Sequence, residues 1–261
     1  MSAPTLEQRL FWRQRPTTQQ HVMYQTWQHL LFLHWEVEPE LIQATLPQGL
    51  TVDTFDGRAY LGLVPFFMLN IRPRFLPAVP AISHFMETNV RTYVYDEHGV
   101  PGVWFYSLDA NQWLAVKLAR TFFKLPYFHA TMQSPYINSW GLTQNPPKKV
   151  AYTVHRQGTD EKTRSHFRYR SAGNGRTAEP GSLEFFLLER YILFATLRGG
   201  QLATGQVYHT PYPVHDAYVA DWDSQLLRLD GFAIEPQRPP DNVLFSPGVK
   251  VDIFPLKKAG R

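Results

Sequence analysis

The chain has 261 residues, of which 44% are hydrophobic, 15% aromatic and 18% charged. Its formal net charge is +4, but the lysines and arginines are scattered, so the clustered basic surface of a nucleic-acid-binding protein is not expected. There is no cysteine, which excludes disulfides, thiol catalysis and thiolate metal ligands. No segment has the ~18 apolar residues of a membrane span, and the N-terminus lacks the apolar core of a signal peptide. We therefore expect a cytoplasmic protein without membrane or nucleic-acid partners.

The sequence predicts a polar N-terminal lead-in followed by one folded domain. Residues 1–20 are mostly polar with some helical character, and residues 21–261 contain no long linker, which favours a single domain. The apolar run at 27–37 predicts a long strand. Pro39 then opens a short helix.

A turn signal separates the next two apolar runs. The pair Asp56-Gly57 stands between them and favours a tight turn, so residues 51–71 are expected to form a hairpin. In this interpretation Asp53 and Asp56 are simply turn residues. Residues 72–82 contain three prolines and predict an irregular loop.

Residues 85–95 predict a strand whose two faces differ in polarity. Alternation places Glu87, Asn89 and Arg91 on one face. Such a line of polar side chains can face solvent, or it can line a polar cavity inside a closed sheet. The opposite face is only moderately apolar, so the second arrangement stays open. A turn at 96–99 is expected to pair this strand with the next one.

The following stretch predicts a strand, a helix and a strand with short connections. Residues 102–108 are rich in aromatics without a helical period, which favours a buried strand. Asp109 can then cap a helix at 110–124, whose apolar and polar residues fall on separate arcs. Pro126 disfavours the helical conformation of the residue before it, and residues 127–132 resume as a strand.

The C-terminal half contains more short strands and few helices. Ser182 predicts the N-cap of a short helix. Strands are expected at residues 148–157, 163–171, 192–197, 202–209 and 248–254. Because the short strands follow one another without a β-α-β rhythm, we expect a mainly β protein, an antiparallel β-barrel with a few short helices.

Five segments resemble the signatures of a known family. They are EPELIQATLPQGLTVDTFDGRAYLGLVPFFM, FMETNVRTYV, GVWFYSLDA, LARTFFKLPYFHATM and PGSLEFFLLERY. Together they are similar to the YqjF-like family, domain of unknown function 2071, over most of residues 20–255. This family resembles in turn the acetoacetate decarboxylase superfamily, whose fold is a β-barrel with an interior pocket. The second resemblance rests on the EPEL segment, on Glu87, and on Arg120 followed six residues later by Pro126.

The resemblance also implies that a catalytic group is missing. Acetoacetate decarboxylases carry two adjacent lysines directly after this proline; one forms a Schiff base with the ketone and the other lowers its pKa. Tyr127 and Phe128 stand at those positions here, so a Schiff-base decarboxylase is not expected. Tyr127 can still donate a hydrogen bond or act as an acid, or it can be a core aromatic residue.

Two functions are compatible with these residues, and whether the protein is an enzyme stays open. In the first, the interior binds a small organic acid or keto compound through Glu87, Asn89, Arg91 and Tyr127. In the second, Glu87 is the base and Tyr127 the acid in enolisation, hydration or decarboxylation-like chemistry on a keto acid. Catalysis requires a raised Glu87 pKa, whereas an ion pair with Arg91 keeps Glu87 ionised. The alternate positions of Glu87 and Arg91 favour the ion pair and therefore binding.

Three other candidate binding residues also have simpler structural interpretations. Arg120 lies on the polar arc of its helix, where it is solvated or anchors an anion. Glu189 either pairs with Arg190 and holds its helix to the barrel, or it is a carboxylate of the pocket. His34 is expected to pack inside the barrel.

Two further groups are weighed and set aside. Lys148 and Lys149 also follow a proline, but no helix or arginine precedes them, so a surface pair is favoured over a Schiff-base site. His209, His215 and Asp216 offer metal-ligand types without a compact spacing. We therefore expect no metal and no cofactor, and a small anionic or carbonyl-containing ligand as the partner; self-association is left open. A filled interior would instead indicate an interaction scaffold.

Overall fold

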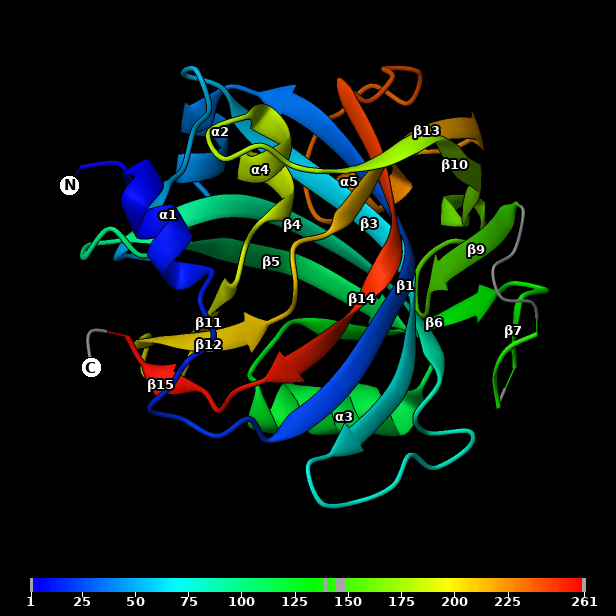
Figure 1. Ribbon diagram of the computed structural model, residues 1–261. Coiled ribbons are helices and arrows are strands. Elements are labelled where there is room, and N and C mark those ends of the chain that lie inside the picture. The colour runs from blue at the N-terminus through cyan, green and yellow to red at the C-terminus, as the bar shows by residue number, and fades with distance from the viewer. Residues whose placement is uncertain (1, 139, 144–148, 260–261) are drawn as a thin grey trace.

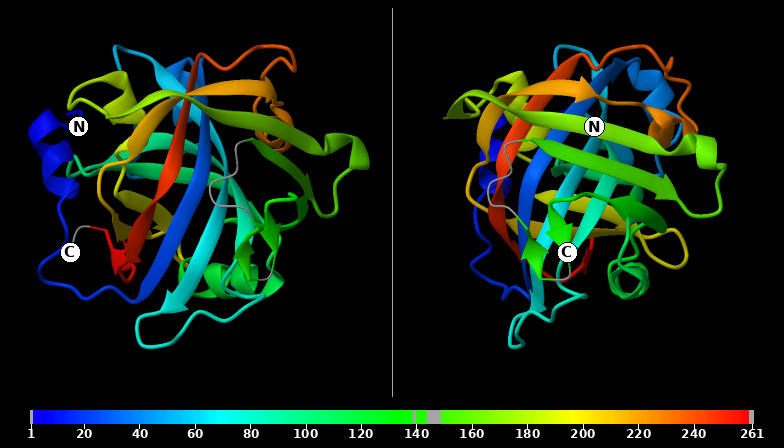
Figure 2. Two further views of the ribbon diagram at one scale, coloured as in Figure 1. Left: turned by 45° about the vertical axis from the view of Figure 1, so that its right-hand side comes forward. Right: turned by 90° about the vertical axis from the view of Figure 1, so that its right-hand side faces the viewer.

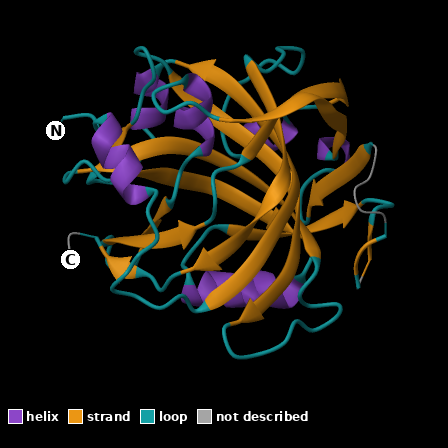
Figure 3. Cartoon of the chain, viewed as in Figure 1, coloured by secondary structure: helices purple, strands orange, loops and turns teal. Residues whose placement is uncertain are grey.

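The computed structural model describes residues 2–138, 140–143 and 149–259, except for the side chains of residues 118–122. Its helices are short, and none of those described is long and apolar enough to cross a membrane (Figure 3). The helices are α1 (Leu6–Trp12), α2 (Pro39–Gln43), α3 (Trp113–Phe122), α4 (Leu183–Leu188) and α5 (Gln225–Leu229). The strands are β1 (Met23–Val37), β2 (Leu50–Val52), β3 (Ala59–Pro73), β4 (Phe85–Asp96), β5 (Pro101–Ala110), β6 (Tyr127–Gln133), β7 (Ile137–Asn138), β8 (Gly141–Leu142), β9 (Val150–Arg156), β10 (Ser165–Thr177), β11 (Ile192–Thr196), β12 (Leu202–Tyr208), β13 (Pro213–Asp221), β14 (Asn242–Ile253) and β15 (Lys257–Lys258).

Most strands form one large sheet that closes on itself (Figure 1). The sheet order is β15-β12-β11-β5-β6-β9-β10-β13-β14-β1-β3-β4-β2, and β4 also pairs with β5, which closes a ring through β6, β9, β10 and β13. A further pairing of β12 with β14 closes a second ring through β11 and β12. The strands common to both rings are β14, β1, β3, β4 and β5, and we call them the central wall.

The middle of the central wall, formed by β3 and β4, is buried on both faces. Every residue of β4 is buried, as are residues 59–69 of β3. Alternate residues of β4 face two different clusters of buried side chains. The cluster that contains Tyr93 is called the first core, and the cluster that contains Val90 is called the second core. Because both faces are covered, a polar side chain on either face of β4 is removed from water.

Helices α3 and α4 lie at opposite ends of the first core, α3 at the bottom and α4 at the top of Figure 1. Val116 of α3 and Phe186 of α4 both pack into this core. The predicted cap of α4 is confirmed, because the Ser182 hydroxyl accepts a hydrogen bond from the Phe185 N–H at 3.2 Å. The predicted cap of α3 is wrong. The Gln112 side chain accepts the Leu114 N–H at 2.8 Å instead, and Asp109 belongs to strand β5.

The predicted hairpin at residues 51–71 is also wrong. Strand β2 pairs with β4, in the register Val52 to Val94, and only an isolated bridge from Phe55 to Arg58 closes the turn. Strand β3 uses both of its edges for other partners, β1 and β4, so β2 has no edge of β3 to pair with. Strand β13 was not anticipated, and it supplies the edge that closes the ring against β14 (Figure 2).

Asp53 is a buried ion-pair partner, so the expectation of a simple turn residue is wrong. Its carboxylate accepts hydrogen bonds from Arg9 of α1 at 2.7 and 2.8 Å and from Arg190, just after α4, at 2.7 Å. Burial alone raises the pKa of Asp53, but the two guanidinium groups outweigh burial and lower it. Two helical segments are thereby tied to the residue that follows β2, and the first of them lies in the polar lead-in.

Gly102 is required where β11 joins the central wall. A Cβ at this position would lie 2.7 Å from the backbone oxygen of Ile192 and 2.7 Å from the ring of Phe194. We expect Gly102→Ala to lower the free energy of unfolding by about 1–3 kcal/mol, because the backbone of β11 must move away. Urea unfolding of the two proteins measures this difference.

Gly205→Ala in the neighbouring strand β12 is the matched control. Its Cβ would first meet the flexible ends of the Leu193 and Leu256 side chains, at 3.1 Å. A smaller loss of stability is expected, because these side chains can rotate. Equal losses in the two variants would contradict a specific requirement at Gly102.

Candidate functional site

The first core contains a carboxylate in direct contact with a phenol. The Tyr127 hydroxyl donates a hydrogen bond of 2.7 Å to Glu87, and the two residues are 9% and 3% exposed. The sheet register explains the contact: Asn89 of β4 lies opposite Leu108 of β5, and Leu108 lies beside Tyr127 of β6. Side chains at matched positions of neighbouring strands point to the same face, so Glu87 and Tyr127 both enter the first core.

Burial gives this pair its acid–base properties. Removal from water raises the pKa of Glu87 to about 7; hydrogen bonds from Tyr127 and Asn89 act in the opposite direction, and the charge of Asp109 adds to the rise. Burial also raises the pKa of Tyr127 well above its usual value, and the Glu87 charge contributes in the same direction. At neutral pH Glu87 can therefore both accept and release a proton, while Tyr127 remains a hydrogen-bond donor.

The backbone that carries Glu87 is held from the second core. The buried hydroxyl of Tyr152 on β9 donates a hydrogen bond of 2.8 Å to the backbone oxygen of Glu87. The Thr88 hydroxyl contacts the same oxygen atom of Tyr152 at 3.2 Å. The position of the Glu87 carboxylate along the strand is thereby fixed by groups on the opposite side of the wall.

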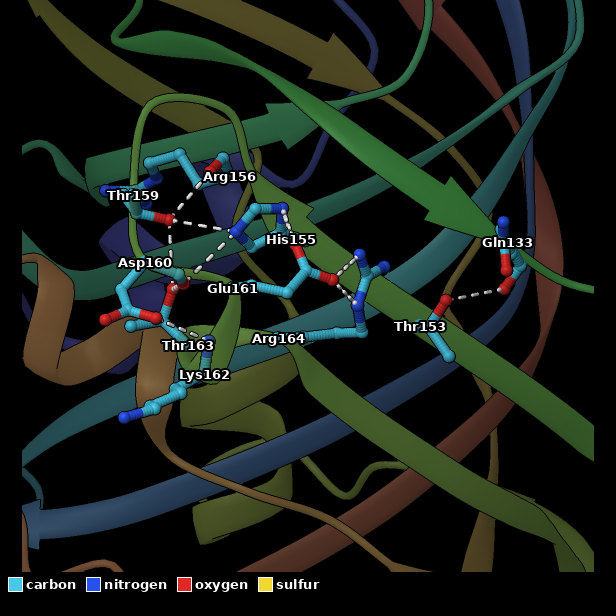
Figure 4. A network of polar contacts seen from close by, with 10 residues as sticks. All are labelled: Gln133, Thr153, His155, Arg156, Thr159, Asp160, Glu161, Lys162, Thr163 and Arg164. Atoms are coloured by element: carbon cyan, nitrogen blue, oxygen red, sulfur yellow. Dashed lines mark hydrogen bonds and ion pairs between the residues drawn. The ribbon is translucent and has the colours of Figure 1, made fainter.

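Asp109 and Arg156 form a charged group that the sequence did not reveal. The Arg156 guanidinium donates two hydrogen bonds of 2.8 Å to Asp109 and one of 2.7 Å to Asp230. Arg156 ends strand β9, and its backbone oxygen accepts a hydrogen bond of 2.7 Å from the Thr159 hydroxyl in the turn toward β10 (Figure 4). Burial raises the pKa of Asp109 despite Arg156. No pattern around Asp109 indicated this partner, because it lies 47 positions away in the sequence.

Asn89 and Arg91 lie on the first-core face of β4, but the expected ion pair between Arg91 and Glu87 is wrong. Arg91 instead donates from Nη2 to the backbone oxygen of Leu187 at 3.3 Å and to the Tyr93 hydroxyl at 3.4 Å. Its guanidinium therefore turns toward α4 rather than toward Glu87. Because Arg91 does not pair with Glu87, it does not offset the effect of burial, which raises the pKa of Glu87.

Glu189 does not pair with Arg190, contrary to one of the two expectations. Its carboxylate accepts the Tyr191 hydroxyl and, at 3.0 Å, the Tyr212 N–H, whereas Arg190 binds Asp53. Burial raises the pKa of Glu189. Glu189 lies just after α4, at the end of the first core away from α3.

His34 packs inside the sheet as expected, and it is fully buried with Nε2 at 2.8 Å from the Tyr93 hydroxyl. Burial, assisted by the positive charge of Arg91, lowers the pKa of His34 to about 3. The side chain of Arg120 lies outside the described part of the structure, as does Lys148, and Lys149 is exposed.

His209 and Asp216, two of the candidate metal ligands, contact different partners. His209 is buried with Nδ1 at 2.7 Å from the Thr210 backbone oxygen, while Asp216 pairs with Arg176. Within the described residues, no group of three or more His, Asp or Glu side chains is arranged to hold a metal ion.

Two hollows lie on the outside of the molecule. One, of about 390 Å³, is lined by residues 20–22 and 73–76. The other, of about 370 Å³, lies beside residues 11–19 and strand β12. Neither is lined by Glu87 or Tyr127, so the contact between these two residues belongs to the interior.

The sequence matches one family over most of its length. The profile of domain of unknown function 2071, described as an uncharacterized conserved protein, matches residues 24–250. The chain belongs to this family. A relative described as uncharacterized protein YqjF, from Bacillus subtilis (strain 168), is 39% identical over 196 residues, which cover 75% of this chain and 76% of the relative.

Solved structures of acetoacetate decarboxylase-like proteins are similar to almost the whole chain. The enduracididine biosynthesis enzyme MppR in complex with pyruvate has a TM-score of 0.57 at 15% identity, over 91% of both chains. The acetoacetate decarboxylase of Legionella pneumophila has a TM-score of 0.56 at 10% identity, over 94% of this chain and 90% of that one. An acetoacetate decarboxylase-like enzyme from Sphingomonas wittichii RW1 has a TM-score of 0.55 at 14% identity, over 92% and 94%. These similarities confirm the predicted fold class.

The raised pKa of Glu87 predicts a specific dependence of stability on pH. In the unfolded chain Glu87 titrates near 4.5, and in the folded protein near 7, so only the folded protein keeps the proton between these values. Stability from this group therefore falls as pH rises from 4.5 to 7, by about 3 kcal/mol in total. We therefore expect the free energy of unfolding of Glu87→Gln, relative to that of the wild type, to increase by this amount between pH 4.5 and pH 8.

Urea unfolding of both proteins across this pH range measures the difference, and other titrating groups largely cancel in the comparison. Tyr127→Phe provides a second check. It removes a hydrogen bond that favours the ionised carboxylate, so the upper end of the window should move above pH 7. A pH-independent difference between Glu87→Gln and the wild type would contradict the raised pKa.

Proposed function

We propose that the protein binds a small keto compound in the first core and moves a proton at the carbon next to the carbonyl group. Glu87 is the base, and Tyr127 donates a hydrogen bond to the carbonyl oxygen. The observation that carries the proposal is the buried 2.7 Å contact between Tyr127 and a Glu87 whose pKa is about 7. A general base works best when its pKa is near the working pH.

The proton movement balances without an amine nucleophile. The carbonyl oxygen of the ligand replaces Glu87 as the acceptor of the Tyr127 hydrogen bond. Glu87 then takes a proton from the adjacent carbon, and the electron pair of the C–H bond moves to the carbonyl oxygen to give an enolate. Tyr127 stabilises the enolate oxygen, and Glu87 returns a proton to carbon. Losing the Tyr127 hydrogen bond also makes Glu87 a stronger base, because that bond favours its ionised form.

Two observations support proton transfer over simple binding. Arg91 turns toward α4, so Arg91 does not hold Glu87 as a permanently ionised anchor. Structural neighbours supply a chemical precedent: MppR has been solved with pyruvate and with the condensation product of pyruvate and imidazole 4-carboxaldehyde. MppR is 15% and 14% identical to this chain in these two comparisons, so its ligands are not assigned to this chain. The proposal rests on Glu87 and Tyr127.

Exchange of carbon-bound hydrogen in D₂O tests the proposal. We expect the wild type to accelerate deuterium incorporation beside the carbonyl of a methyl ketone or keto acid, followed by proton NMR. Glu87→Gln should abolish the acceleration, and Tyr127→Phe should reduce it about 10- to 100-fold, since the enolate loses its donor.

Tyr169→Phe is the matched control for Tyr127→Phe. Tyr169 is also a buried tyrosine whose hydroxyl donates a hydrogen bond, here to the His29 backbone oxygen at 2.7 Å, but it belongs to the second core. The Tyr169→Phe variant should exchange the carbon-bound hydrogen of the ligand at the wild-type rate. Ligand binding without any exchange would overturn the catalytic role of Glu87 and leave a binding protein.

A further inference from the structure

Arg91 is a buried cation without a carboxylate partner among the described residues. Its side chain is only 9% exposed. Two other buried arginines do have such partners: Arg156 binds Asp109 and Asp230, and Arg190 binds Asp53. In the described ranges of the chain, Arg91 contacts a backbone oxygen, a hydroxyl and the faces of two aromatic rings, Phe32 and Tyr93, at 5.5 and 5.6 Å.

A buried guanidinium in such surroundings favours an anion beside it. Neutral acceptors and aromatic faces offset only part of the cost of removing a full charge from water. In addition, Arg91 Nε and the Asn89 side-chain oxygen are buried and have no hydrogen-bond partner within the part of the chain that the structure describes. Both residues lie on the face of β4 that carries Glu87, so a ligand that occupied the first core would contact all three from one side.

The chain makes room for this guanidinium. Gly62 of β3 lies directly opposite Arg91, and a Cβ there would lie 3.3 Å from Arg91 Cγ and 3.3 Å from His34 Cδ2. The absence of a side chain at Gly62 therefore lets Arg91 and His34 pack against β3. His34 remains neutral, because burial lowers its pKa to about 3, and adds no competing charge.

Arg91 and Glu87 mark two separate points along the first core. Four residues on one strand span ~13 Å between Cα atoms. The hydrogen bond to Leu187 of α4 directs the Arg91 side chain toward the α4 end of the first core. Tyr127 begins β6, the strand that follows α3 in the chain, and α3 lies at the opposite end (Figure 1). A ligand that contacts both points must carry its anionic group well away from its carbonyl group.

We propose that Arg91 binds the carboxylate of the substrate, which is a keto acid with several carbons between carboxylate and carbonyl. This inference rests on the proposed function for the position of the carbonyl group. The carboxylate accepts from Nε and the free guanidinium N–H groups of Arg91. Asn89 lies between Glu87 and Arg91 on β4. Its side-chain oxygen can accept a hydrogen bond from a donor group of the ligand or from a bridging water.

A matched pair of ligands tests the proposal. 6-Oxoheptanoate and 2-heptanone share a methyl ketone and the same chain length. They differ only at the far end of the chain, which is a carboxylate in 6-oxoheptanoate and a methyl group in 2-heptanone. We expect 6-oxoheptanoate to bind about 10- to 100-fold more tightly by isothermal titration calorimetry, as charge-assisted hydrogen bonds of this kind give. Pyruvate, whose carboxylate adjoins the carbonyl, should gain little from Arg91. Equal affinity for the matched pair would overturn the inference.

Arg91→Met is the corresponding variant. It should lose the preference for 6-oxoheptanoate and keep its affinity for 2-heptanone, whereas Arg91→Lys should keep part of the preference. A preference that survives in Arg91→Met would also overturn the inference. If Arg91→Met fails to fold, the wild-type comparison of the ligand pair still decides.

Failure of this inference is distinguishable from failure of the proposed function. Glu87→Gln should retain the preference for 6-oxoheptanoate in binding, since Arg91 is unchanged, while losing hydrogen exchange. Exchange of 2-heptanone hydrogens by the wild type, together with equal binding of the two ligands, would retain Glu87 as the base and eliminate Arg91 as the anion site. Preferential binding of 6-oxoheptanoate without hydrogen exchange would retain Arg91 as the anion site and eliminate Glu87 as the base.

Discussion

The structure depends on one constraint, the burial of β3 and β4, the middle strands of the central wall, on both faces. Strand β4 has no solvent-facing side, so each polar group on it must find a partner within the protein or remain costly. The second-core face meets this demand with neutral groups, such as the Tyr152 hydroxyl on the Glu87 backbone oxygen. The first-core face carries ionisable side chains instead, and their properties follow from the same lack of water.

Glu87 and Arg91 show how this constraint separates two charges that the strand alternation brings to one face. Had the side chains turned toward one another, each would have neutralised the other. The contact of Arg91 with Leu187 and that of Tyr127 with Glu87 draw them to different partners. A carboxylate left with a neutral donor in an apolar interior retains its proton up to about pH 7. A guanidinium cannot release its proton in the same way, and so its need for a counter-ion persists.

The proposed function depends on where the chain enters β6. Pro126 brings the chain into β6, and the first residue of that strand, Tyr127, reaches the carboxylate of β4. The resemblance implies that lysines occupy this point in the decarboxylases. A phenol here cannot form an iminium, but it can polarise a carbonyl group beside a base. Such a pair suits proton transfer, a step that needs no covalent intermediate.

The sequence by itself determined the mainly β architecture, most strands, the cap at Ser182, and the placement of Glu87, Asn89 and Arg91 on one face of a strand. These features depend on neighbours in sequence, through the two-residue period of strands and the local hydrogen bonds of turns and caps. The family resemblance, carried by contiguous motifs, also pointed to Tyr127.

Only the tertiary structure decided which charged groups meet. Asp53 reads as a turn residue and Asp109 as a helix cap because their partners, Arg190 and Arg156, lie 137 and 47 positions away. The same holds for the partner of Arg91, a backbone oxygen 96 positions away that no side-chain pattern reveals. Long-range pairing in a closed sheet depends on which strands share an edge, and local propensity does not encode that order.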